Sequence, residues 1–238
     1  MNIKTQESLN GVPMQPITTA IFDMDGLIID SEPLWQEAQI DCFRPLGVPI
    51  DRELCRQSAG KRLDEVIAGW HERFGWDGPD VGEMHDAVLE AVTRLIIERG
   101  EALPGVTETM ETLGNLGIRM AIASSSPPAL IKAVVRKLAL ERHLELTHSG
   151  ALETRGKPDP AVFLSTARKL GAVPGQCVVF EDAPSGIEAA GRAGMHVIAV
   201  PSVFAPDDPG IRVADRVLHT LTDFRPEMID LPPKAAAS

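Results

Sequence analysis

Short apolar runs alternate with longer amphipathic segments along most of this chain. The first run, residues 17–22, has the length and composition of a buried strand. Later runs have the same character, at residues 118–123, 144–147, 177–180 and 196–200. Apolar residues recur at helical spacing between these runs, at residues 106–116, 129–138, 161–170 and 185–193. Strands that alternate with helices predict an α/β domain with a doubly wound parallel sheet.

The chain between the first strand and residue 102 follows a different, helical pattern. Apolar residues recur every three or four positions, and no strand pattern appears, in residues 33–47, 63–70 and 81–100. We therefore predict a small inserted helical domain, residues 32–102. Residues 1–31 and 103–238 are then expected to form the α/β core.

The composition is that of an ordinary globular protein, with 44% hydrophobic and 24% charged residues among 238. A formal net charge of −11 argues against nucleic acid or an anionic membrane as a partner, because both bind clustered Lys and Arg. The three cysteines form no motif, residues 1–16 carry no apolar signal segment, and no run reaches the ~18 apolar residues of a membrane span. We predict a cytoplasmic protein and expect a monomer.

Two carboxylates, Asp23 and Asp25, stand one residue apart where the first strand ends, and Gly26 follows them. Carboxylates held close together repel each other, so this pair either binds a hard cation or shares a proton. Oxygen ligands at such a position suit Mg²⁺, which usually takes one or two carboxylates together with a substrate phosphate. The plainer alternative is that both aspartates are turn residues after a buried strand.

Further candidate groups follow two other predicted strands. Three serines, residues 124–126, come after one strand, and Glu181 and Asp182 come after another, while Lys157 lies in the sequence GKPDP. Parallel strands bring their carboxyl ends to one edge of the sheet, where ligands of such folds bind. Carboxylates for a cation, hydroxyl and N–H groups for an anion, and a lysine together fit a phosphate with Mg²⁺. Taken singly, the serines can cap a helix, the acids can belong to a loop and the lysine can be solvated.

These four clusters resemble the four motifs of the haloacid dehalogenase superfamily: DMDG at residues 23–26, Ser124, GKPDP around Lys157, and FEDAPSG at residues 180–186. The helical insert is similar to the cap domain of the β-phosphoglucomutase-like branch. The stretch IFDMDGLIIDSEPLW, residues 21–35, resembles bacterial sugar-phosphate phosphatases of the hexitol and 2-deoxyglucose 6-phosphate type. The resemblance implies a Rossmann-type core with a helical cap.

The resemblance also implies a role for each acidic residue. Asp23 would be the nucleophile that takes the phosphoryl group as an aspartyl phosphate, and Asp25 would protonate the leaving alkoxide and then act as a base on water. Mg²⁺ would bind the Asp23 carboxylate, the Asp25 backbone carbonyl and Asp182, with Glu181 as a ligand or as support outside the metal shell.

Phosphate contacts are implied as well. Ser124 and the N–H group of Ser125 would hold the phosphoryl oxygens, and Lys157 would neutralise them. The sequence Gly60-Lys61-Arg62 resembles a substrate-contacting loop of the cap, so Arg62 or Lys61 can hold sugar hydroxyls, although either can also be a solvated surface residue.

Trp35 bears on the choice between two reactions. Mutases of the branch carry a histidine ten residues after the second aspartate of the first motif, and Trp35 takes that position here. This difference favours hydrolysis over phosphoryl transfer to a second sugar hydroxyl. Trp35 is expected either to pack in the cap core or to offer an apolar platform to a sugar.

The expected function is a Mg²⁺-dependent phosphatase that acts on small sugar or sugar-alcohol monophosphates. A sugar phosphomutase of the β-phosphoglucomutase type is the first alternative. A catalytically silent protein that binds phosphorylated metabolites is the second.

Overall fold

The computed structural model describes residues 16–232 and residue 234, and it contains a parallel six-stranded sheet with the order β3-β2-β1-β4-β5-β6. The strands are β1 Thr19–Phe22, β2 Arg119–Ser124, β3 Leu146–Ser149, β4 Cys177–Glu181, β5 His196–Ala199 and β6 Arg216–Val217. The predicted doubly wound α/β fold is confirmed. The expectation that residues 1–16 lack a signal segment lies almost wholly outside the described residues.

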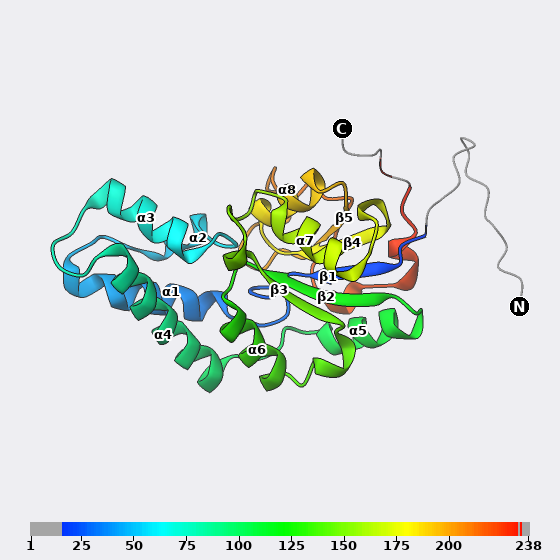
Figure 1. Cartoon of the computed structure of the whole chain (residues 1–238), viewed down its shortest axis with the longest axis horizontal. Coiled ribbons are helices and arrows are strands. Elements are labelled where there is room, and N and C mark those ends of the chain that lie inside the picture. Colours follow the sequence, from blue (N-terminus) through cyan, green and yellow to red (C-terminus); the bar gives the residue numbers. More distant parts are fainter. Residues whose placement is uncertain (1–15, 233, 235–238) are drawn as a thin grey trace, which may run out of the picture.

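Helices cover both faces of the sheet (Figure 1). On one face lie α5 Val106–Asn115 and α6 Pro128–Lys137, and on the other lie α7 Ala161–Leu170 and α8 Pro184–Arg192. Strand β1 alternates between these layers, because Phe22 packs in the cluster on the α5 and α6 side while Ile21 packs in the cluster of α7 and α8. Phe22 also stacks on Phe180 of β4, with ring centroids 4.7 Å apart. The centre of the sheet is therefore dry and rigid on both faces.

Four more helices follow β1 and lie together beyond one end of the sheet (Figure 1). They are α1 Glu32–Phe43, α2 Arg52–Gln57, α3 Leu63–Phe74 and α4 Val81–Arg99, and α4 packs along α1 and α3. We call this group the cap helices. Division of the chain into domains at residues 31/32 and 102/103 stays a prediction.

The sequence patterns missed two short elements and misplaced a third. Helix α2 is a single short segment whose N-cap Asp51 accepts a hydrogen bond from the Leu54 N–H, and it is too short to show helical periodicity. Strand β6 has two exposed residues at the sheet edge, so it carries no apolar run. Strand β3 begins two residues later than predicted, at Leu146.

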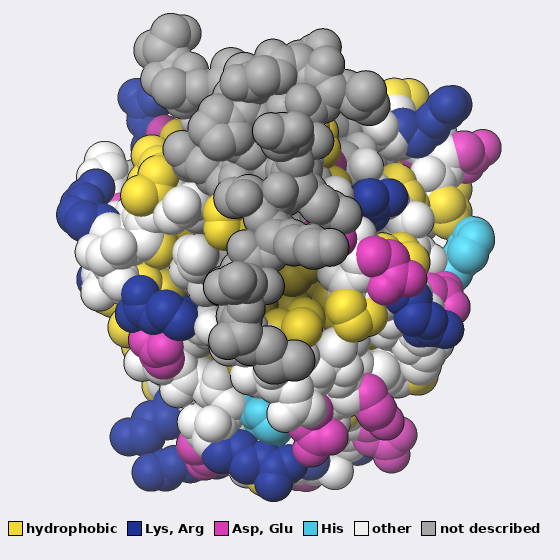
Figure 2. Space-filling model, turned by 90° about the vertical axis from the view of Figure 1, so that its right-hand side faces the viewer, with side chains coloured by type: hydrophobic (Ala, Val, Ile, Leu, Met, Phe, Trp, Pro, Cys, Tyr) yellow, Lys and Arg dark blue, Asp and Glu magenta, His cyan; other side chains and the backbone are white. Residues whose placement is uncertain are grey.

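The surface away from the cap helices mixes both signs of charge. Figure 2 shows this end of the molecule, where Lys and Arg side chains lie among Asp and Glu side chains. Within residues 16–232 and residue 234, none of the helices is long and apolar enough to cross a membrane.

Candidate active site

Strand register brings the predicted groups to one edge of the sheet. Phe22 of β1 pairs with Ile122 of β2 and with Phe180 of β4, so the chain segments that follow these residues leave the sheet side by side. Asp23 and Glu181 are almost fully buried there, at 3% and 0% exposure. Burial of both carboxylates favours a role in the site over the alternatives of plain turn residues for Asp23 and loop acids for Glu181.

Lys157 links these two carboxylates. Its Nζ lies 2.6 Å from Asp23 Oδ1 and 2.6 Å from Glu181 Oε1, and its side chain is buried. Burial lowers the pKa of Lys157, but the two carboxylates outweigh burial and raise this pKa above its ordinary value. The amine is thus a fixed positive charge, and the alternative of a solvated lysine is wrong.

Asp23 has more negatively charged than positively charged neighbours, since Glu181 and Asp25 lie near it together with Lys157. Burial raises its pKa to about 7, Glu181 and Asp25 raise it as well, and Lys157 acts in the opposite direction. The pKa of Asp182 is also raised well above its usual range, first by burial and then by the charges of Glu181, Glu32 and Asp23. The site is thus short of positive charge, as expected where a cation binds beside buried carboxylates.

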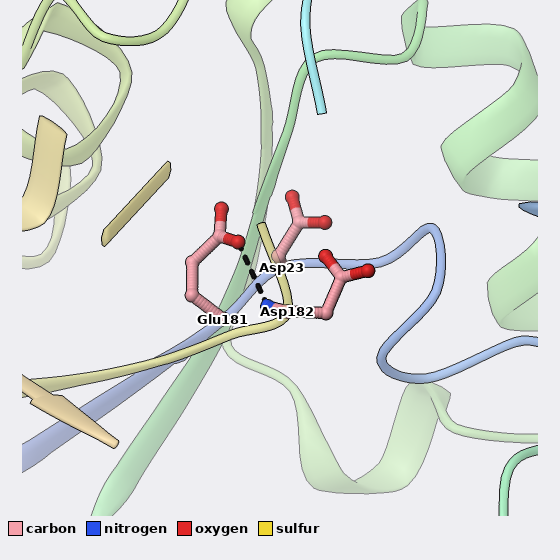
Figure 3. Close-up of side chains that lie close together, drawn as sticks. All are labelled: Asp23, Glu181 and Asp182. Atoms are coloured by element: carbon pink, nitrogen blue, oxygen red, sulfur yellow. Dashed lines mark hydrogen bonds between the residues drawn. The ribbon is translucent and has the colours of Figure 1, made fainter. Parts of the chain in front are cut away.

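Asp23, Glu181 and Asp182 form an acidic cluster that can hold a metal ion (Figure 3). One carboxylate oxygen from each residue lies within 4.8 Å of the others. Glu181 Oε2 accepts hydrogen bonds from the N–H groups of Asp182 and Ala183, and Asp182 Oδ2 accepts one from Ser202 Oγ. Glu181 therefore supports the turn, while Asp23 and Asp182 keep oxygens without such partners. An all-oxygen set of this kind fits Mg²⁺.

Two glycines let the chain pass close to this cluster. Gly26 has φ +76°, and a Cβ atom there would lie 2.3 Å from Asp182 Oδ2. A Cβ atom on Gly186 would lie 1.6 Å from Glu181 Oε1. These contacts explain why glycine follows each acidic motif.

Asp25 lies beside this cluster and is held by donors on both of its oxygens. Ser31 Oγ and Trp35 Nε1 donate to Oδ1 at 2.7 and 2.9 Å, while Ser126 Oγ and Ser124 Oγ donate to Oδ2 at 2.7 and 3.4 Å. The bond from Trp35 belongs to neither role expected from the sequence, and the donor roles of Ser31 and Ser126 were not predicted. The Asp25 backbone carbonyl remains its predicted metal contact, because its carboxylate is outside the acidic cluster.

The serine triplet joins the core to the cap helices instead of capping α6. The N-cap of α6 is Pro127, which has no side chain to cap the helix, so the alternative of helix-capping serines is wrong. Ser125 Oγ donates to the Gly60 carbonyl of the cap at 2.8 Å. The hydroxyl of Ser125 thus ties the cap to the core, and phosphate binding by its N–H stays a prediction.

Arg62 is a second link between the cap and the core. Its guanidinium pairs with Asp64, and Nη1 donates to the Glu153 carbonyl at 2.7 Å. The side chain is 14% exposed, so the alternative of a solvated surface residue is wrong for Arg62. Lys61 is exposed and also lines the cavity described next. Arg62 also lines the cavity, so a ligand contact by Arg62 or by Lys61 stays a prediction.

A cavity of about 480 Å³ separates the strand ends from the cap helices. Asp23, Asp25 and the serines lie at its core end, and residues of the cap helices, Trp35 among them, form the remaining wall. Glu32, which the sequence did not mark as a site residue, is also in this wall. Burial first, and then the charges of Asp25, Asp23 and Asp30, together raise the pKa of Glu32 to about 8.

Comparisons with known proteins agree with this arrangement. Residues 17–194 match the family of haloacid dehalogenase-like hydrolases. Hexitol phosphatase B of Escherichia coli (strain K12) is 38% identical over 210 residues, covering 87% of this chain and 94% of that protein. A phosphorylated carbohydrates phosphatase of Thermotoga maritima is 34% identical over 178 residues, covering 75% and 82% of the two chains.

Solved structures of the same type superpose well. The crystal structure of CbbY from Rhodobacter sphaeroides in complex with phosphate has a TM-score of 0.78 at 26% identity and covers 87% of this chain and 96% of its own. A β-phosphoglucomutase from Clostridium difficile, at 22% identity and a TM-score of 0.79, shares the fold and covers 90% and 95% of the two chains. The resemblance seen in the sequence motifs is thus confirmed: the chain belongs to the haloacid dehalogenase-like hydrolases and is a phosphatase of that family.

Proposed function

We propose that the chain hydrolyses monophosphate esters of small sugars or sugar alcohols through an aspartyl phosphate on Asp23. The observation that carries the proposal is the buried Lys157–Asp23 contact of 2.6 Å at the core end of the cavity. It fixes a carboxylate oxygen and a positive charge where a phosphoryl group would enter. The names of the relatives, a hexitol phosphatase and a carbohydrate phosphatase, support the substrate class.

We propose Mg²⁺ as the cofactor, held by Asp23, Asp182 and the Asp25 carbonyl, with Glu181 as support. The support for this assignment is the all-oxygen donor set and the raised pKa values of Asp23 and Asp182. When bound, the ion supplies neutralisation of charge on the phosphoryl oxygens.

The residues of the chain divide the reaction into two steps. Asp23 attacks phosphorus and forms a new O–P bond, while the ester O–P bond breaks and the alkoxide leaves with a proton from Asp25. Water then attacks the same phosphorus and gives a proton to Asp25, while the bond between the Asp23 oxygen and phosphorus breaks. Phosphate is released, Asp23 leaves as a carboxylate and Asp25 is again protonated. Lys157, Ser124 and the Ser125 N–H would stabilise the charge that the phosphoryl oxygens carry throughout.

A sugar phosphomutase remains the alternative, and a hydrogen bond made by Trp35 supports it. Trp35 Nε1 donates to Asp25 at 2.9 Å, so the donor that a mutase takes from histidine is present. The indole cannot give up this proton as an imidazolium can, which separates the two residues chemically. Hydrolysis is preferred because the relatives with the higher identities are phosphatases. A catalytically silent binding protein is not supported, because the chain belongs to a hydrolase family and its named relatives are phosphatases.

We also propose a monomer that works in the cytoplasm, with residues 32–102 as a domain of its own. The free state of Cys42, Cys55 and Cys177 supports a reducing compartment.

Phosphate release from hexitol, hexose, pentose and glycerol phosphates tests the function. Wild type and Asp23→Asn would be compared with Mg²⁺ and after chelation. We expect release that needs both Mg²⁺ and Asp23. Full activity of Asp23→Asn would sink the mechanism, and isomerisation of a hexose 1-phosphate without phosphate release would establish the mutase.

A further inference from the structure

One face of α1 borders the cavity with polar side chains. Glu32, Trp35, Gln36 and Gln39 all line it, and their spacing places them on the same side of the helix. The opposite wall on α4 is formed by Val81, Gly82, His85 and Leu89. The α1 wall is therefore polar, while the α4 wall is mostly apolar.

Two of these side chains, Glu32 and Gln39, are mostly buried, at 6% and 7% exposure, and both line the cavity. Their neighbours differ: Trp35 donates to Asp25, and Gln36 accepts from Arg52. Neither Glu32 nor Gln39 is among the fully enclosed unpaired polar groups of the described residues, which are Thr19, Ser185 and His196. The polar atoms of Glu32 and Gln39 are therefore available to water or to a ligand in the cavity.

These two side chains lie at different depths. Helix α1 begins beside the sheet edge and runs outward among the cap helices (Figure 1). Glu32 is in its first turn, close enough to Asp25 and Asp23 to feel their charges. Gln39 lies seven residues further on, which is ~10 Å along the helix axis. A ligand anchored by its phosphate at Asp23 would pass Glu32 before it reached Gln39.

We infer that Glu32 and Gln39 recognise the hydroxyl groups of the substrate by hydrogen bonds. Glu32 contacts hydroxyls near the phosphate ester, and Gln39 contacts those at the far end of the carbon chain. The site thereby selects monophosphates of six-carbon polyols or sugars over three-carbon esters, which end before Gln39. This inference rests on the proposed function and adds chain length to it. Glu32 keeps a proton near neutral pH because its pKa is raised, so its carboxyl group and the amide of Gln39 can each donate and accept.

The test compares kcat/KM for a hexitol 6-phosphate and for glycerol 3-phosphate. Gln39→Leu removes the amide at similar size, and Gln57→Leu, at an exposed position outside the cavity, is the matched control. We expect wild type to prefer the hexitol ester. Gln39→Leu should lower kcat/KM for that ester by about tenfold, mainly through KM, with a much smaller loss for the glycerol ester.

Glu32→Leu provides the second arm, with exposed Glu72→Leu as its control. Because Glu32 lies near the ester, this variant should raise KM for both substrates. Losses in Gln39→Leu that do not depend on chain length, or no loss at all, would overturn the inference while the wild-type phosphatase activity stands. No phosphate release by wild type from either ester would count against the proposed function itself.

Binding provides a readout without turnover. Calorimetry of the hexitol ester with Asp23→Asn, in the presence of Mg²⁺, should show weaker affinity when Gln39→Leu is added. Unchanged affinity in that double variant would contradict the role of Gln39, and thermal melting of each variant verifies that it is folded.

Discussion

At the scale of single residues, Lys157 has the largest share in holding the site together. It is the buried cation between Asp23 and Glu181. Lys157→Met should lower kcat/KM by roughly 100-fold or more, because a preorganised charge at the phosphoryl group is lost. It should also lower the free energy of unfolding by about 3 kcal/mol, since two buried carboxylates lose their partner.

Steady-state kinetics and urea unfolding measure the two effects of Lys157→Met. Lys132→Met, on the exposed side of α6, is the control and should change neither. Wild-type activity in Lys157→Met would contradict the assignment of Lys157 to the phosphoryl group.

Glu32 should make stability depend on pH. Its pKa is about 8 in the fold against an ordinary value of 4.5, so between these values the folded chain holds a proton that the unfolded chain has lost. The contribution of Glu32 to the free energy of unfolding therefore falls as pH rises from about 5 to 8. Relative to wild type, metal-free Glu32→Gln should gain about 3 kcal/mol over that interval.

Urea unfolding of both proteins at pH 5 and pH 8, with chelator present, would measure this difference. A difference between the two proteins that stays constant with pH would show that Glu32 is ionised at both values and would contradict its raised pKa.

At the scale of elements, side chains at the start of α1 donate hydrogen bonds to Asp25, and the helix lacks a capping bond as a result. Ser31 is the N-cap but makes no capping bond, because its hydroxyl donates to Asp25 Oδ1 together with Trp35 Nε1. A lost cap costs about 1 kcal/mol of stability. The turn therefore acts as a clamp that orients the proposed acid and base.

Trp35→Phe tests this clamp. Removing the indole N–H should lower kcat about tenfold and leave KM nearly unchanged, because Asp25 loses one of its orienting bonds. Trp35→His should recover part of the loss, and Trp76→Phe is the control, since Trp76 Nε1 donates to Pro79 outside the cavity. A loss seen only in KM would instead support the sugar platform expected from the sequence.

Elements also mark the limit of sequence reasoning. Periodicity predicted the central strands because they are buried on both faces, and parallel strand ends predicted that Asp23 and Glu181 lie on one edge. Hydrophobic periodicity could not predict β6, because this strand is exposed, or α2, because this helix is short. The bond from Trp35 to Asp25 depends on how α1 leaves the sheet, and a local pattern carries no information on that angle.

At the scale of the whole molecule, the cap helices are fastened to the core around the cavity. Ser125 Oγ bonds the Gly60 carbonyl, Arg62 bonds the Glu153 carbonyl, and the Gly156 N–H donates to Glu65. Gly156 immediately precedes Lys157, so a cap contact lies next to the buried lysine. The sequence suggested a substrate-contacting loop at residues 60–62, but which side chain faces the cavity and which joins the core follows only from tertiary contacts.

The proposed mechanism requires a covalent phosphoryl group on Asp23, and chemical trapping tests directly whether this intermediate forms. The enzyme would be quenched during turnover of a hexitol 6-phosphate and reduced with borohydride, which converts an acyl phosphate of aspartate to homoserine. Peptide mass spectrometry should then find homoserine at position 23 only when substrate and Mg²⁺ are present. Turnover at full rate with no modified Asp23, or with the label at Asp25 or Asp182, would contradict the mechanism.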